Sequence, residues 1–190
     1  MKRIAVFLAE GFEEVEALTP VDILRRGGYE VVTVSVKDKA DEDALLVESS
    51  HEIGIMADIC IDDLDFDSLD MILLPGGMPG TKNLEKCKTL IAQIRAFDEQ
   101  KKYIAAICAA PSILGNMGIL AGKKAVSYPS FEEFLSGAEV PNTEVAVDGH
   151  IITSRGMGCA IPFSLAIVET LSNEAKAKEL AREVIYEVYR

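Results

Sequence analysis

Residues 103–118 read YIAAICAAPSILGNMG, and this stretch predicts a short buried strand that leads directly into a helix. Small and β-branched residues fill Tyr103–Ile107, which is typical of a strand covered on both faces. A helical pattern begins immediately after Cys108 and continues over Ala109–Met117. A strand followed at once by a helix is the unit from which α/β domains are built.

The same alternation of apolar runs and helical patterns extends along the chain and predicts an α/β fold, with a mostly parallel central sheet and helices on both faces. The predicted strands are Arg3–Leu8, Glu30–Val36, Met71–Leu74, Tyr103–Ile107 and Ala125–Ser127, and the predicted helices are Glu14–Arg26, Lys88–Gln100, Ala109–Met117, Cys159–Leu171 and Asn173–Tyr189. In the last helix Leu180, Val184, Ile185 and Val188 form one apolar stripe.

Three local features interrupt this pattern. Residues 37–64 hold an acidic loop and then a loosely alternating stretch, which predicts a small hairpin or edge strands. Residues 144–154 alternate around Asp148-Gly149, a favourable hairpin turn. Pro20 should kink the first helix or mark a restart. With no repeat or linker, residues 1–190 are expected to form a single domain.

Composition limits the partners of the chain. The 190 residues carry a formal charge of −12, which disfavours nucleic acid and anionic membranes because both attract Lys and Arg. Acidic residues interrupt the apolar N-terminus before a signal peptide can develop, and no apolar stretch approaches the roughly 18 residues of a membrane span. We therefore expect a cytoplasmic protein.

Cys108 is the strongest candidate for a reactive group. A nucleophile on a sharp strand-to-helix turn requires small residues on either side, and Ala106 and Ala110 supply them. Pro111 fits the first helical turn. A thiol at a helix N-terminus is expected to have a lowered pKa. The alternative is that Cys108 is one more small buried hydrophobe.

The other cysteines have simpler explanations. Cys60 lies in an alternating strand, Cys87 lies in a polar helical stretch, and Cys159 lies at a helix start, where it is the nearest rival to Cys108. The wide spacing of the four thiols argues against a metal site and, in a reducing compartment, against disulfides.

Two glycine motifs lie where predicted strands end. LLPGGMPG, residues 73–80, places Gly76 and Gly77 at a strand end, where free backbone amides can hold an oxyanion; an ordinary turn is the alternative. It lacks the ending of a phosphate loop, and TSRGMG lacks the third glycine of a dinucleotide fingerprint, so no cofactor is expected. In TSRGMG, Arg155 either faces substrate or lies on the surface.

The segment EGFEEVEALTP, residues 10–20, opens the first helix with three acids. Glu13 and Glu14 fit the favourable interaction of carboxylates with a helix N-terminus. Glu16 instead precedes residues expected to pack inward. Burial would raise its pKa until the carboxyl could donate a proton.

Together, EGFEEVEALTPVDILRRGG, LLPGG, YIAAICAAPSILG and ITSRGMG resemble the DJ-one/ThiJ/PfpI superfamily in matching order, closest to its Parkinson-associated branch and bacterial relatives. The resemblance implies a flavodoxin-like three-layer sandwich and a homodimer. It implies that Cys108 is the catalytic cysteine and Glu16 the acid hydrogen-bonded to it. The anion pocket then comprises the backbone of Gly76, Gly77 and Ala109, with Arg155 nearby.

The chain departs from the family at its histidines. Many members place histidine directly after the cysteine, where this chain has Ala109, so a peptidase would lack its Cys-His pair. The Parkinson-associated branch takes a histidine from a later loop, where this chain has Tyr128, and we expect slower turnover as a result. His51 could reach a site across a dimer interface, whereas His150 should be exposed.

Two functions remain in competition. The first is a glyoxalase III or protein deglycase acting on α-oxoaldehydes or their protein adducts through Cys108 and Glu16. The second is a redox-responsive sensor or chaperone-like protein that uses oxidation of the same cysteine. A thiamine-pathway enzyme or an intracellular peptidase has less support, because the chain shows no nucleotide motif and no Cys-His pair.

Overall fold

The computed structural model describes residues 1–186 and contains a seven-stranded sheet in the order β5-β2-β1-β6-β7-β9-β8. All neighbouring strands are parallel except β8 and β9, which form an antiparallel pair. The strands are β1 (Arg3–Leu8), β2 (Glu30–Ser35), β5 (Ile59–Cys60), β6 (Met71–Leu74), β7 (Tyr103–Ile107), β8 (Val145–Asp148) and β9 (Ile151–Ser154). This architecture confirms the predicted mostly parallel α/β sheet.

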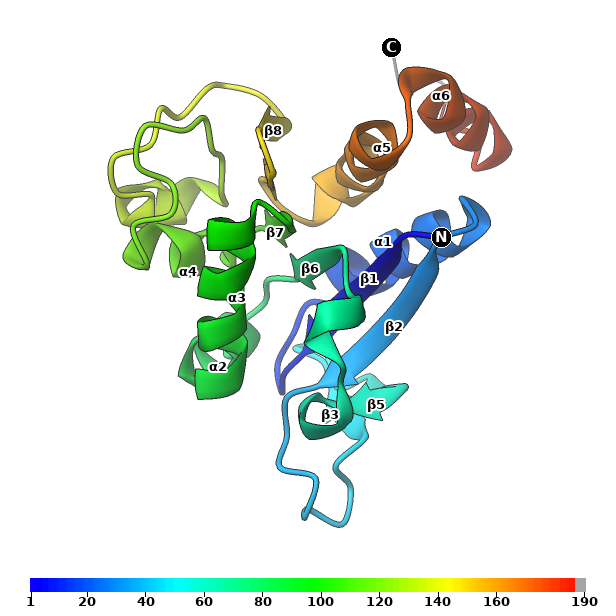
Figure 1. Ribbon diagram of the computed structural model, residues 1–190, viewed down its shortest axis with the longest axis vertical. Helices are drawn as coiled ribbons and strands as arrows, with labels where there is room; N and C mark the ends of the chain where they lie inside the picture. Colours follow the sequence, from blue (N-terminus) through cyan, green and yellow to red (C-terminus); the bar gives the residue numbers. More distant parts are fainter. Residues whose placement is uncertain (187–190) are drawn as a thin grey trace.

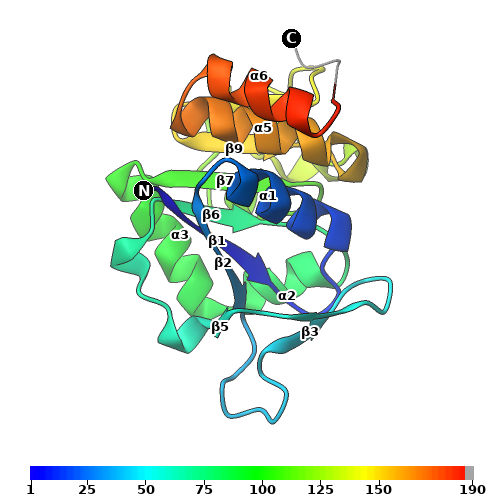
Figure 2. The same cartoon turned by 90° about the vertical axis from the view of Figure 1, so that its right-hand side faces the viewer.

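Helices cover both faces of the sheet (Figures 1 and 2). On one face lie α1 (Glu14–Arg26), α5 (Ala160–Leu171) and α6 (Glu174–Glu183), and on the other lie α2 (Gly80–Lys86), α3 (Lys88–Gln100) and α4 (Pro111–Asn116). Alternate side chains of β1 enter two separate core clusters: Val6 and Leu8 face the first set of helices, and Ala5 and Phe7 face the second. The flavodoxin-like three-layer sandwich is therefore confirmed. Within residues 1–186, no helix has the length and apolar character to cross a bilayer.

Most predicted elements occur at or within one or two residues of their predicted bounds. The α2 helix was not predicted, because its sequence GTKNLEK offers only Leu84 as a large apolar residue facing the core. The α1 helix continues through Pro20 without interruption. The C-terminal helix ends at Glu183 rather than extending to Tyr189; Ile185 has a positive φ of 57° and is 80% exposed. The last residues of that prediction, 187–189, lie outside the described residues.

The predicted strand Ala125–Ser127 is wrong. The Ala125 N–H donates to the Glu139 carbonyl, and the Val126 N–H donates to the Thr153 hydroxyl. These bonds give the backbone N–H groups of Ala125 and Val126 partners outside any β-sheet ladder. The place beside β7 is occupied instead by β9.

Both irregular regions form the small β structures that the sequence predicts. The β8–β9 hairpin turns at Gly149, which has a positive φ of 62°. Residues 37–64 contain a separate hairpin of β3 (Leu46–Glu48) and β4 (Gly54–Met56), followed by the edge strand β5.

The contact between α4 and the 3₁₀ segment Pro129–Phe134 gives the first testable prediction. A Cβ at Gly115 would overlap the backbone carbonyl of Phe134, which cannot move away as a flexible side chain could. Gly115→Ala is therefore expected to lower the free energy of unfolding by about 2–3 kcal/mol. Urea unfolding measures this, with Gly158→Ala as the control because a Cβ there meets nothing within 4 Å. Equal stability of the two variants would contradict the packing described.

Candidate active site

Most of the predicted site residues converge where the parallel strands end. Cys108 follows β7, Gly76 follows β6 and Arg155 follows β9, while Glu16 lies in the first turn of α1, shortly after β1. In open α/β sheets this carboxyl edge is where ligands bind. The topology thus gathers four segments that are far apart in the sequence.

Cys108 occupies a strained turn between β7 and α4. Its φ is 65°, a left-handed conformation that costs a non-glycine residue about 1–3 kcal/mol. Two hydrogen bonds hold the turn: the Cys108 N–H donates to the Ser154 carbonyl at 3.0 Å, and the Cys108 carbonyl accepts from the Tyr128 N–H at 2.8 Å. The backbone therefore has the elbow geometry that its small neighbours predict.

Glu16 is the buried carboxyl beside the thiol. It is 1% exposed, accepts a 3.0 Å hydrogen bond from the Gly76 N–H, and is also hydrogen-bonded to the Met157 N–H and to Cys108. Desolvation outweighs these bonds and raises the pKa of Glu16 to about 7. The raised pKa agrees with the sequence-based expectation.

Glycine is required at position 76. A Cβ there would lie 2.6 Å from the Cys108 Cβ and 2.7 Å from Glu16 Oε2. The close approach allows the thiol, the carboxyl and the backbone amide to share one small space. Because the Gly76 N–H already binds Glu16, it is not free for the anion pocket in which we expected it.

The environment of the sulfur corrects the expected pKa of the thiol. Burial, followed by the negative charge of Glu16, raises the pKa of Cys108 to about 12, although the N–H groups of Gly77 and Ala109 favour the thiolate. The expected lowering of the pKa at a helix N-terminus does not occur, because burial and Glu16 outweigh it. The α4 helix begins only at Pro111 and spans six residues. The two amides remain candidates for holding an anion at the sulfur.

Cys108 and Glu16 therefore titrate as a pair. When the pair holds one proton, that proton can lie on the Glu16 carboxyl, which leaves a thiolate, or on the Cys108 thiol, which leaves a carboxylate. The total charge is the same in both arrangements. The first proton leaves the pair with an apparent pKa of about 7, close to that of Glu16. Above this pH the pair holds a single proton.

A groove of about 450 Å³ has Tyr128, Arg155 and Met157 among its lining residues. It adjoins Glu16 through the Met157 backbone, although neither Glu16 nor Cys108 lines it. Tyr128 is 50% exposed, and its ring approaches Gly156, whose backbone also lies beside Glu16. The structure thus brings Tyr128 and Arg155 to the same side of the site. The sequence did not predict that the Met157 N–H binds Glu16, because any residue type can supply a backbone donor. The sequence pointed only to the segment TSRGMG that contains it.

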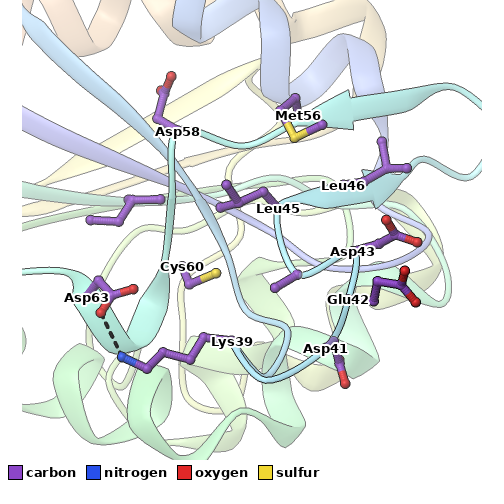
Figure 3. A pocket seen from close by; sticks show the side chains of 12 residues that line it. Lys39, Asp41, Glu42, Asp43, Leu45, Leu46, Met56, Asp58, Cys60 and Asp63 are labelled. Atoms are coloured by element: carbon purple, nitrogen blue, oxygen red, sulfur yellow. Dashed lines mark hydrogen bonds and ion pairs between the residues drawn. The ribbon is translucent and has the colours of Figure 1, made fainter.

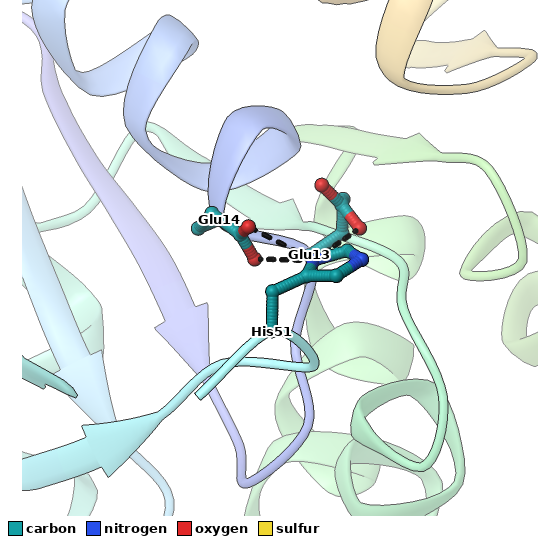
Figure 4. Close-up of side chains that lie close together, drawn as sticks. All are labelled: Glu13, Glu14 and His51. Atoms are coloured by element: carbon teal, nitrogen blue, oxygen red, sulfur yellow. Dashed lines mark hydrogen bonds and ion pairs between the residues drawn. The ribbon is translucent and has the colours of Figure 1, made fainter. Parts of the chain in front are cut away.

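Both histidines bind carboxylates other than Glu16. His51 is exposed and binds Glu14 and Glu13, as Figure 4 shows, and the hydrogen bond to Glu14 raises its pKa. His150 is buried rather than exposed, since its Nε2 lies 2.7 Å from Asp98. Neither imidazole is among the groups hydrogen-bonded to Glu16 or Cys108 within this chain.

The remaining cysteines are free thiols outside the pair. Cys159 lies in the groove beside Arg155, and burial raises its pKa. Cys60 lies on the edge strand β5, by a cavity of about 590 Å³ under the acidic loop (Figure 3). Three strands separate β5 from β7 in the sheet, so this cavity is remote from Cys108.

The burial of Glu16 makes stability depend on pH. A carboxyl whose pKa rises from 4.5 to about 7 on folding stabilises the fold fully below pH 4.5 and loses that contribution as pH rises through 7. Glu16→Gln stays neutral, so its stability relative to wild type should rise by about 3 kcal/mol between pH 4.5 and pH 8. Urea unfolding at both pH values measures this, with the exposed Glu99→Gln as control. An unchanged difference would contradict the burial of the charge.

Comparison with known proteins agrees with this fold. The family model described as DJ-1/PfpI family matches residues 2–170. Protein DJ-1 homolog A of Arabidopsis thaliana is 39% identical over 183 residues, covering 95% of this chain and 45% of that protein. The chain thus spans less than half the length of this relative.

Two further proteins are similar over nearly their whole length. The glutathione-independent glyoxalase DJR-1.2 of Caenorhabditis elegans is 29% identical, over 91% of this chain and 90% of that protein. The solved structure of oxidized Toxoplasma gondii DJ-1 superposes with a TM-score of 0.92 at 36% identity, covering 100% of both chains. The family match over most of the chain and these similarities establish that the protein belongs to the DJ-1/PfpI family.

Proposed function

We propose that the protein is a Cys108-dependent enzyme of the glyoxalase III or protein deglycase type, acting on small α-oxoaldehydes or their protein adducts. The observation that carries the proposal is the hydrogen-bonded pair of a strained thiol and a buried carboxyl with an apparent pKa of about 7. A group with this pKa exchanges protons readily at neutral pH. The glyoxalase name of the nematode relative supports the same chemistry.

The first step is addition of the thiol to methylglyoxal. The Cys108 sulfur bonds to the aldehyde carbon while its proton passes to the Glu16 carboxylate. The carbonyl electrons move to oxygen, and the N–H groups of Gly77 and Ala109 stabilise this oxyanion. The proton then returns from Glu16 to the oxygen and completes a hemithioacetal.

The second step is isomerisation. The Glu16 carboxylate removes the hydrogen of the former aldehyde carbon as a proton, and the neighbouring carbon is then protonated, which yields a thioester of lactic acid. Water cleaves the thioester and regenerates the Cys108 thiol. The sum is methylglyoxal plus water giving lactic acid, with no net oxidation.

In this proposal substrate approaches from the groove lined by Tyr128 and Arg155, which adjoins Glu16 through the Met157 backbone. The Arg155 guanidinium can hold the carboxylate product or a polar adduct. Ala109 follows the cysteine directly, so no imidazole is available there to protonate the amine leaving group of a peptide. This favours aldehyde chemistry over peptidase chemistry.

A second candidate function is redox sensing at the same cysteine. Peroxide would convert the Cys108 thiolate to sulfenic and then sulfinic acid, and a protonated Glu16 could donate a hydrogen bond to the sulfinate. The similar Toxoplasma structure is described as oxidized, which supports this chemistry for the family. Mass spectrometry after mild peroxide tests it, because oxidation of Cys159 or Cys87 before Cys108 would exclude the sensor.

We also propose a homodimer acting in the cytoplasm, without nucleic acid or membrane partners. An apolar groove of about 370 Å³ between α1, α5 and the C-terminal segment supports association, with Val15 38% exposed at its edge. The charge of −12 disfavours polyanionic partners.

Substitution of the pair tests the enzymatic proposal. Cys108→Ser is expected to abolish lactate production from methylglyoxal, and Glu16→Gln to lower kcat/KM by about 10²–10⁴-fold. Cys87→Ser, which removes a thiol outside the pair, should retain full activity. Undiminished activity in Cys108→Ser or Glu16→Gln would exclude this mechanism.

The pH dependence tests the shared proton. The rate of Cys108 alkylation by iodoacetamide should rise with an apparent pKa of about 7 in the wild type, where the pair loses its first proton. In Glu16→Gln the carboxylate base is absent, and burial still disfavours the thiolate. The midpoint of the alkylation rate as a function of pH should therefore move well above pH 8. Peptide mass spectrometry follows the reaction between pH 5 and 10. A single transition near the unperturbed value of about 8.5 in both proteins would contradict the coupling.

A further inference from the structure

Three side chains outside the catalytic pair place ligand atoms of two chemical types around one point (Figure 4). His51 Nδ1 lies 2.9 Å from Glu14 Oε1 and 3.6 Å from Glu13 Oε2. All three ligand atoms lie within 4.8 Å of one another. The imidazole comes from the β3–β4 turn, and the carboxylates come from the start of α1.

Two of the three separations between these ligand atoms are close to those of a tetrahedral metal site. With metal–ligand bonds of about 2.0–2.2 Å, neighbouring ligands in a tetrahedron lie roughly 3.3 Å apart. The two measured separations, 2.9 and 3.6 Å, fall on either side of this value. One imidazole nitrogen and two carboxylates leave a fourth position for water.

The two carboxylates also lack a permanent counter-charge. The side chains of Glu13 and Glu14 are each only 14% exposed, and within residues 1–186 neither forms an ion pair with Lys or Arg. Their sole ion-pair partner there is His51, which is 62% exposed and charged only when protonated. Two partly desolvated negative charges exceed the roughly half positive charge of the α1 N-terminus, so the position favours a cation.

The site is held in place before any ligand binds. The Ser50 N–H donates to the Phe12 carbonyl at 2.8 Å, which ties the turn to the start of α1. The Ser50 hydroxyl lies 3.3 Å from both Glu13 Oε2 and His51 Nδ1. A metal would therefore replace a proton within an existing cluster, with little reorganisation of the backbone.

We propose that Glu13, Glu14 and His51 form a binding site for a divalent transition metal ion of the Zn²⁺ type. Imidazole as a ligand selects Zn²⁺ and its neighbours over Mg²⁺ and Ca²⁺, which prefer oxygen ligands alone. The bound ion would join the β3–β4 turn to α1. The Glu13 N–H donates to the Gly76 carbonyl at 2.9 Å, so this metal site lies next to the active site without sharing its side chains.

Titration with Co²⁺ and Zn²⁺ tests the proposal on the full chain. Calorimetry should show one Zn²⁺ per chain, and His51→Ala and Glu14→Gln should each weaken binding by about 100-fold or more. Glu52→Gln removes the same charge from a neighbouring residue, and Cys108→Ser removes the reactive thiol. Both control variants should bind as wild type.

The Co²⁺ spectrum separates this site from binding by cysteine. A site of one nitrogen and two oxygens gives weak visible bands and lacks the intense near-ultraviolet band of thiolate-to-cobalt charge transfer. Circular dichroism of each variant checks that the fold is retained. The proposal is overturned if no metal binds, if His51→Ala binds as tightly as wild type, or if binding disappears in Cys108→Ser.

Discussion

The carboxyl of Glu16 is buried against the thiol of Cys108, and the rest of the site depends on how these two groups share a proton. Burial disfavours a charge on either group, so neither has its ordinary pKa. Backbone amides offset part of this cost: those of Gly76 and Met157 at the carboxyl, and those of Gly77 and Ala109 at the sulfur. The outcome is a pair that loses its first proton near neutral pH, which suits proton transfer to and from a bound aldehyde.

The parallel sheet makes this arrangement possible. The ends of β6, β7 and β9 lie side by side, so short turns deliver the amides, the thiol and the Ser154 carbonyl to one place. Cys108 bears a positive φ because neighbouring backbone bonds hold its turn, and Gly76 leaves the space that a side chain would fill. The α4 helix, which follows the elbow, packs closely against Pro129–Phe134 at Gly115.

Sequence patterns predicted the parts of this structure that depend on periodicity and residue size. The elbow follows from Ala106 and Ala110 around Cys108, and the sheet follows from the apolar runs. Sequence patterns were less able to predict interactions between segments that are distant in the chain. The Met157 amide was not foreseen, His150 is buried through Asp98, and Ala125–Ser127 bonds to a side chain and a loop instead of a strand. The thiol pKa was misjudged because a helix start is visible in sequence, whereas the desolvation of a site is not.

Direct observation of the Glu16 carboxyl offers the sharpest test of the shared proton. Carbon-13 NMR of the side-chain carboxyl, in protein labelled on glutamate and assigned through Glu16→Gln, reports its ionisation as pH is varied. The account predicts that this carboxyl titrates near pH 7, and that its titration changes in Cys108→Ser because the partner group is altered. A Glu16 resonance that titrates near the ordinary value of 4.5, with or without Cys108, would contradict the account.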